Sequence, residues 1–227
     1  MEYFIKEPSL EEKIIGSDYP QAYKFVKGYN PDEPRAFFSL YKYKSSFPDY
    51  IPELDGIMLS GSAKLTDFIS GGFSPQTLIV SEKAKSILEQ YHLCPHRFYP
   101  MGLYKRKIKY NYYLFFIVSD YIDFIDYKKT SFVEYNIVSG KKFGLVSIAS
   151  KEELFFRREI FKKEKGISQT IWGDKIVMNQ SFDSELDFFE IRWIDANTYV
   201  SKRLKNAIES NRLTGWEFTP TTNLIVK

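Results

Sequence analysis

Two stretches of the chain share one pattern of apolar and polar positions. Residues 78–100 (LIVSEKAKSILEQYHLCPHRFYP) and 198–220 (TYVSKRLKNAIESNRLTGWEFTP) lie 120 positions apart and align without a gap. Seven aligned pairs are identical, whereas ordinary composition predicts about one or two. The repeat therefore predicts two copies of one structural unit. The identical pairs are Val80/Val200, Ser81/Ser201, Lys85/Lys205, Glu89/Glu209, Leu93/Leu213, Phe98/Phe218 and Pro100/Pro220.

Each copy opens with the pattern of a strand that leads into a helix. Residues 78–80 and 198–200 are aliphatic, β-branched or aromatic, as is typical of a strand. A serine follows in both copies, Ser81 or Ser201, and its hydroxyl can accept a hydrogen bond from a free amide of the first helical turn. Apolar residues then recur at helical spacing, which predicts a helix with one buried face in each copy.

The buried face of each helix and the return strand complete the unit. Leu88 and Ile208 are predicted to lie on the buried faces. Asn211, which tolerates a left-handed backbone, is predicted to end the second helix. Short strands should begin at Phe98 and Phe218 and end at the next proline, which cannot donate a ladder hydrogen bond. The connection suits a right-handed crossover between parallel strands, and an antiparallel return remains open.

Outside the repeat, strands alternate with helices, which predicts an α+β (mixed α/β) fold with a mixed sheet. We expect a single domain over residues 1–227, with an irregular, aromatic-rich N-terminal wrap at 1–56 and an α/β core at 57–227. The wrap holds six of the ten prolines. The predicted elements are β-like pieces at 23–26 and 37–43, a helix at 63–69, a charged helix at 151–163, and strands at 57–59, 112–118, 132–138, 145–148, 175–178 and 188–193.

Composition narrows the cellular setting. The chain has 227 residues, of which 44% are hydrophobic, and can bury a substantial core. Its longest apolar runs fall far short of a membrane span, and its start has no apolar signal region. The single cysteine, Cys94, cannot form an internal disulfide, so we expect a cytosolic protein. A net charge of +3 is too small for a dedicated nucleic-acid binder, and the 17 tyrosines suit a protein interface or reflect coding bias.

His92, Cys94 and His96 have the residue types of a metal site. A structural zinc site needs four ligands, and the chain holds no further histidine or cysteine. The aligned positions of the second copy hold Arg212, Thr214 and Trp216, which do not bind zinc. We therefore expect no metal and no cofactor.

Two other clusters invite a chemical interpretation. Asp120, Asp123 and Asp126 could supply paired carboxylates to a hydrolase, although interleaved apolar residues favour a solvated turn or strand edge. A basic and aromatic run could bind single-stranded nucleic acid through charge and stacking, although lysines often guard a solvated hairpin. That run contains Tyr104, Lys105, Arg106, Lys107, Lys109, Tyr110, Tyr112 and Tyr113.

Three segments of the chain resemble a known family. The segment YNYYLFFIVSDYIDFIDYKKTSF, a later FFEIRW and the ending YVSKRLKNAIESNRLTGWEF resemble the bacterial immunity proteins of polymorphic toxin systems. The similar group is immunity protein 11, with the immunity protein 43 group as second choice, and the resemblance covers roughly residues 78–220. Most matched residues look structural. The residues assigned a structural role are Ser81, Leu88, Phe98, Ser201, Ile208, Gly215 and Phe218.

The resemblance implies a non-enzymatic protein that binds and neutralises a cognate toxin domain in the producer's cytosol, with the toxin encoded by an adjacent gene. A nucleic-acid-binding domain is the alternative. Because partner-specific contacts should lie outside the repeated scaffold, we expect the toxin to contact two segments of the chain. These segments supply Tyr41 and Tyr43 from one, and Tyr104, Lys105, Arg106, Lys107, Lys109 and Tyr110 from the other.

Overall fold

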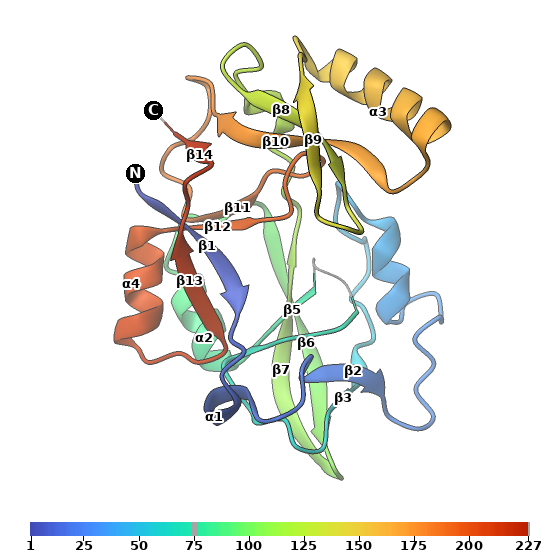
Figure 1. Ribbon diagram of the computed structural model, residues 1–227. Helices are drawn as coiled ribbons and strands as arrows, with labels where there is room; N and C mark the ends of the chain where they lie inside the picture. The colour runs from blue at the N-terminus through green and yellow to red at the C-terminus, as the bar shows by residue number, and fades with distance from the viewer. Residues whose placement is uncertain (74–76, 227) are drawn as a thin grey trace.

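The computed structural model describes residues 1–73 and 77–226 and confirms the α+β class. Three β-sheets, rather than one mixed sheet, form its framework, and the two repeat copies lie in different sheets (Figure 1). Among the described residues, we find no helix with the length and apolar character needed to cross a membrane.

The first repeat copy belongs to a six-stranded sheet with the order β2-β3-β6-β7-β5-β4. Within it, β5 and β6 run parallel, because each pairs antiparallel with β7, which lies between them. Helix α2 connects β5 to β6. The elements are β2 (Ala22–Phe25), β3 (Asp55–Leu59), β4 (Phe68–Ile69), β5 (Thr77–Val80), α2 (Glu82–Leu88), β6 (His96–Lys105) and β7 (Ile108–Ile117).

The second copy forms a four-stranded sheet with the order β11-β12-β1-β13. Here β12 and β13 are the parallel pair, and the strand between them is β1, from the N-terminus of the chain. Figure 1 shows β1, in blue, beside the red-orange strands of the C-terminus. The elements are β1 (Tyr3–Pro8), β11 (Phe188–Glu190), β12 (Thr198–Ser201), α4 (Lys202–Ser210) and β13 (Trp216–Pro220).

The two sheets match residue by residue, even at the inserted strand. In the first copy Tyr113 pairs with both Val80 and Pro100. In the second copy Phe4 pairs with both aligned residues, Val200 and Pro220. Strand β1 therefore occupies the place of β7, although the two strands come from unrelated parts of the chain.

The lysine that the two copies share, Lys85 or Lys205, contacts the inserted strand in each copy. The Lys85 ammonium lies 5.1 Å from the Tyr113 ring centre, and the Lys205 ammonium lies 5.1 Å from the Phe4 ring centre. Each lysine also pairs with a glutamate four residues later in its helix, Glu89 or Glu209. In each copy the lysine thus holds its helix against the inserted strand through a cation–π contact.

The repeat extends upstream to an aspartate that ties each helix start to a neighbouring strand. Ser81 caps α2 by accepting from the Ala84 amide, and Ser201 caps α4 in the same way. Each serine hydroxyl also donates to an aspartate 14 residues earlier, Asp67 or Asp187. The predicted caps are therefore confirmed. Each capping serine also links its helix start to the aspartate that directly precedes a neighbouring strand, β4 or β11.

The two copies interlock through the loops that follow their helices. The Phe68 amide donates to the Thr214 carbonyl at 2.9 Å, and the Cys94 amide donates to the Phe188 carbonyl at 2.9 Å. Gly215 is required at this crossing, because a Cβ there would lie 2.0 Å from the Phe68 carbonyl oxygen. The structure thus gives a physical reason for the glycine at this position.

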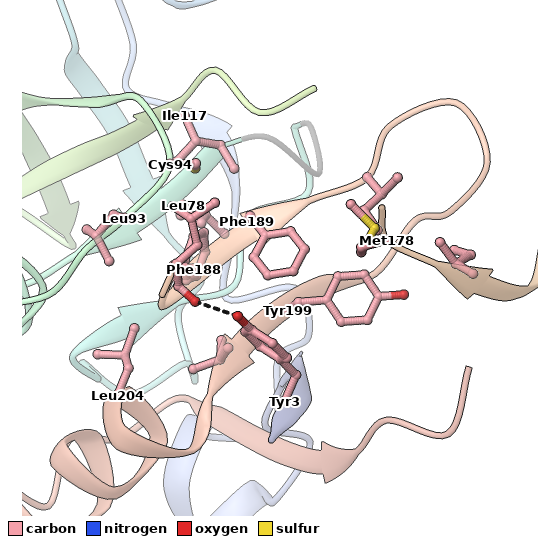
Figure 2. Close-up of a cluster of buried hydrophobic side chains, with 14 of the residues drawn as sticks. Tyr3, Leu78, Leu93, Cys94, Ile117, Met178, Phe188, Phe189, Tyr199 and Leu204 are labelled. Atoms are coloured by element: carbon pink, nitrogen blue, oxygen red, sulfur yellow. Dashed lines mark hydrogen bonds between the residues drawn. The ribbon is translucent and has the colours of Figure 1, made fainter. Parts of the chain in front are cut away.

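Side chains from both copies meet in the larger of two hydrophobic cores. Figure 2 shows Leu78 and Leu93 of the first copy close to Phe188 and Leu204 of the second. Tyr3 of β1 joins them, and its hydroxyl donates to the backbone carbonyl of Leu186 at 3.0 Å. The smaller core lies under the other face of the six-stranded sheet and is covered by the N-terminal segment.

A third sheet, with the order β14-β10-β8-β9, packs against helix α3. The sequence predicted strands near β8, β9 and β10 and a helix near α3, although the boundaries differ. The elements are β8 (Ser131–Asn136), β9 (Lys142–Val146), α3 (Lys151–Lys165), β10 (Gln169–Val177) and β14 (Leu224–Ile225). The remaining elements are α1 (Glu12–Ile15) and two short 3-10 helices at Phe37–Lys42 and Ile122–Phe124.

Several predictions of local structure are wrong. Residues 63–69 form no helix and instead end in β4, because Phe68 pairs across to Val80. The piece at 37–43 is a 3-10 helix and not a strand. Strand β6 does not end at Pro100, because it continues as the long hairpin with β7. Asn211 does end α4, but the left-handed residue is Arg212, with φ of 54°.

Leu88→Ala and Ile208→Ala should each lower the free energy of unfolding by about 2–5 kcal/mol, because each removes a fully buried branched side chain. Chemical denaturation followed by circular dichroism measures the change. The matched control is Leu10→Ala, where the leucine is 67% exposed and the expected change is within about 0.5 kcal/mol. Equal stability of the core variants and the control would contradict the packing described.

Candidate functional site

A cavity of about 580 Å³ opens where β1, β4, β13 and the segment after β11 meet. Its size lies within the range of small-ligand sites in proteins. Exposed residues such as Lys44 and Trp193 surround its mouth, and buried residues such as Leu78 and Thr198 form its floor. Its further lining residues include Lys6, Pro8, Ile69, Asp120, Glu190, Arg192, Asp195, Asn197, Gly215 and Trp216.

A polar row crosses the sheet at this cavity. Lys6 on β1 pairs with Thr198 on β12, and Thr198 pairs with Glu190 on β11. The three side chains therefore share one face of three adjacent strands. The Thr198 hydroxyl donates to the Glu190 carboxylate at 3.1 Å.

The first repeat copy serves as an internal control for this row. By the matched register, the counterparts of Lys6 and Thr198 are Phe115 and Leu78, both buried in the larger core. The same scaffold is thus completed with apolar side chains in one copy and with polar side chains, one of them charged, in the other. Because buried charges are generally no better for stability than apolar residues of similar size, the fold alone does not explain the row.

Partial removal from water perturbs both charged ends of the row. Burial lowers the pKa of the Lys6 ammonium to about 8, an effect that the nearby Glu190 opposes. Burial also raises the pKa of the Glu190 carboxyl, and Arg192 opposes that rise. The Lys6 ammonium lies 5.3 Å from the centre of the Trp216 ring, in a cation–π contact.

Arg192 brings a second cation to the cavity. Its guanidinium donates to the backbone carbonyls of Ile117, at 3.2 Å, and Lys44. Its Nε atom lies 3.8 Å from the Glu190 carboxylate, and this buried Nε has no hydrogen-bond partner in the described part of the chain. An unsatisfied buried donor is costly and therefore calls for a structural or functional explanation.

Trp193, at the mouth, adopts a strained backbone. Its φ is 76°, in the left-handed region that bulky residues rarely occupy. Arg158 holds this conformation by donating to the Trp193 carbonyl, and the indole nitrogen donates to Asp120 at 3.2 Å. Strain that the surrounding contacts maintain is typical of functional sites.

The basic run of the sequence forms the tip of the β6–β7 hairpin, which projects at the lower end of Figure 1. Lys109 and the Tyr104 hydroxyl both bond to Asp55, at 2.6 and 3.1 Å. Lys105 donates to the Ala63 carbonyl at 2.7 Å. Arg106 and Lys107 form the exposed turn, and Tyr110 is half-buried beside them.

The predicted aromatic contacts lie on the segment that covers the smaller core. Tyr41 is 37% exposed, and its hydroxyl donates to the Phe73 carbonyl at 2.6 Å. Tyr43 packs edge-on against Tyr50, with ring centres 6.0 Å apart. Both tyrosines therefore contribute to the fold. Their role in binding a toxin stays a prediction.

The residues suspected of metal or acid chemistry have separate structural partners. The His96 ring bonds to the Cys94 carbonyl at 2.9 Å, while His92 faces Asp183 at 3.6 Å. Lys151 binds Asp123, and Lys129 binds Asp126. Among the described residues, no group of three or more histidine, cysteine or acidic side chains has an arrangement that could hold a metal ion.

Sequence reasoning missed the polar row of Lys6, Thr198 and Glu190. Lys6 lies in a segment expected to be irregular, and no repeat offset connects it to Phe115, because the two inserted strands are unrelated in sequence. Glu190 could have been found, because it lies as many residues before Ser201 as Ser70 lies before Ser81 in the first copy. An alignment of the two copies that continued upstream of the serines would have placed Glu190 within the repeat.

The chain is an α+β protein in which two copies of one unit interlock beside a charged cavity. The chain belongs to the immunity protein family (Imm11), whose model matches residues 28–223. The resemblance found in the sequence is thereby confirmed. The match begins after β1, the strand that completes the second sheet. A search of curated proteins found no match.

The Cys94 thiol should resist thiol reagents in the native protein at pH 8. It is fully buried, and burial raises its pKa to about 12, so the reactive thiolate is scarce and shielded. Reaction with a chromogenic disulfide, followed by absorbance, should become fast only in denaturant. Rapid stoichiometric labelling of the native protein would contradict the burial.

Lys6→Met should change the pH dependence of stability. Because the folded-state pKa of Lys6 is about 8 and its ordinary value is 10.5, the unfolded chain binds more protons at Lys6 between these pH values. Wild-type stability should therefore rise relative to the variant as pH increases from 8 to 10.5. Denaturation at several pH values measures this, and the exposed Lys27→Met should show no such trend.

Proposed function

We propose that the protein neutralises a cognate bacterial toxin by forming a direct, stoichiometric complex with it in the cytosol of the producing cell. Membership of the immunity protein family is the observation that carries the proposal. Inhibition of this kind needs affinity rather than turnover, and tight protein pairs typically bury about 1,200–2,000 Å² in total.

The tip of the β6–β7 hairpin is our first candidate for the toxin contact. Its internal bonds leave Arg106 and Lys107 exposed at the turn, next to Ile108, which is 59% exposed. Since the bonds of Tyr104, Lys105 and Lys109 hold the two strands beside the turn, binding would immobilise few additional groups. A basic turn with an apolar neighbour suits an acidic surface that surrounds an apolar pocket.

Co-expression with the toxin domain encoded by the adjacent gene tests the proposal. We expect cells to survive only when the two proteins are present in comparable amounts, and we expect both to co-purify in a fixed ratio. Rescue by substoichiometric amounts, or rescue without a complex, would point to enzymatic repair of the damage and overturn direct binding.

A pair of matched variants tests the hairpin. The double variant Arg106→Ser/Lys107→Ser should slow association with the toxin roughly tenfold at low salt, because it removes charges that steer the encounter. The control, Lys162→Ser/Lys163→Ser, removes two exposed charges from α3 and should leave the rate unchanged. Equal effects of the two variants, measured by surface plasmon resonance, would exclude the hairpin as the contact.

A further inference from the structure

We propose that the cavity beside the second repeat copy is a binding site for a ligand that carries one carboxylate on an aromatic or apolar body. This inference goes beyond toxin neutralisation, because it concerns a ligand that the protein would bind without the toxin. It rests on the charge of the cavity, on its walls and on the comparison between the two copies.

The Lys6 ammonium at the polar row, which forms no ion pair with another described residue, favours an anion as the ligand. Two cations, Lys6 and Arg192, stand beside one carboxylate, Glu190, at the polar row. In the described part of the chain the Lys6 ammonium has no hydrogen bond or ion pair, and its contact is the Trp216 ring. The buried Arg192 Nε is also without a hydrogen-bond partner. A ligand carboxylate would supply the acceptor that the Lys6 ammonium lacks.

The other acidic side chains of the cavity are already occupied. Asp195 accepts from the Asn197 amide at 2.8 Å and from the Asn223 side chain at 3.3 Å, and it also binds the Tyr199 hydroxyl. Asp120 accepts from the Trp193 indole. These carboxylates are therefore held within the protein, which leaves the polar row as the part of the cavity that can respond to a ligand.

The walls of the cavity suit an apolar or planar body. Trp216, Ile69 and Leu78 line it, and Trp193 stands at its mouth. Trp216 is fixed by stacking on Phe68, with ring centres 3.6 Å apart. A small aromatic acid could place its ring against these side chains and its carboxylate at Lys6, because sites of this kind combine apolar walls with a few placed polar groups.

Comparison of the two repeat copies shows that the polar side chains of this site are not needed for sheet packing. Where the first copy has Phe115 and Leu78, the second has Lys6 and Thr198, at matched positions of the same register. The difference lies on the face that the cavity occupies. In the second copy a charged cavity thus replaces apolar packing. Loss of apolar packing at a few positions is expected where a protein binds a ligand.

The carboxylate could come from two sources with the same chemistry. It could belong to a free small molecule, or it could be the end or an acidic side chain of a protein segment that enters the cavity. N-acetylphenylalanine represents both, since it has one carboxylate, one aromatic ring and a peptide group. Its amide, N-acetylphenylalaninamide, is a probe of nearly the same shape without the charge.

The test is a titration of the purified full-length protein with each probe, followed by NMR of the tryptophan indole signals. We expect N-acetylphenylalanine to shift the Trp216 and Trp193 signals in a saturable way and the amide to bind at least about tenfold more weakly, since a charge-assisted contact is lost. Lys6→Met should weaken binding of the acid by a similar factor, whereas Lys27→Met should not.

The outcomes are distinct. Absence of saturable binding, equal binding of acid and amide, or unchanged binding to Lys6→Met would overturn the proposal. If Lys6→Met does not fold, a crystal structure of the wild-type protein soaked with the acid decides. A carboxylate bound to Lys6 supports the site, and a probe bound elsewhere excludes it.

A second arm assigns the source and keeps this inference separate from toxin neutralisation. If the toxin supplies the carboxylate, the toxin domain should displace N-acetylphenylalanine, and Lys6→Met should weaken the complex. If a free molecule supplies it, the toxin should bind equally well with and without the probe. Because probe binding is measured on the protein alone, failure of toxin rescue would leave this result standing.

Discussion

The architecture depends on one constraint: each repeated unit leaves a gap between its two parallel strands, and a third strand must fill it. Backbone amides and carbonyls on both sides of the gap would otherwise be buried without partners. The first unit fills its gap with β7, which follows directly in a hairpin. The second unit is completed by β1, from the opposite end of the chain. The interlocked cores and the cavity both follow from this arrangement.

Sequence alone predicted the repeated units well, because their signals are local. The serine caps and the buried positions of Leu88 and Ile208 are encoded within a dozen residues. Strand β1 escaped prediction because Tyr3–Pro8 is short and contains charge, and because its partners lie almost two hundred residues away. The false helix at 63–69 has the same origin, since Phe68 pairs with Val80 and also bonds to Thr214 of the other unit.

The candidate site was beyond sequence analysis for a related reason. Lys6 and Glu190 are unremarkable in their own segments, and they become a row only when Thr198 is placed between them. The basic hairpin, in contrast, was visible in sequence as a run of charge. What the sequence did not show is that Lys105 and Lys109 bind the protein itself and leave the turn as the free part.

The origin of β1 also bears on synthesis of the chain. A ribosome makes this strand well before its partners β12 and β13, so β1 must wait, unpaired, while the residues between them emerge. The first unit has no such delay, because its strands follow one another closely. Pairings of such long separation form late and slowly. Any chain that stops before β13 therefore presents an open strand edge, the kind of surface that proteases and chaperones detect.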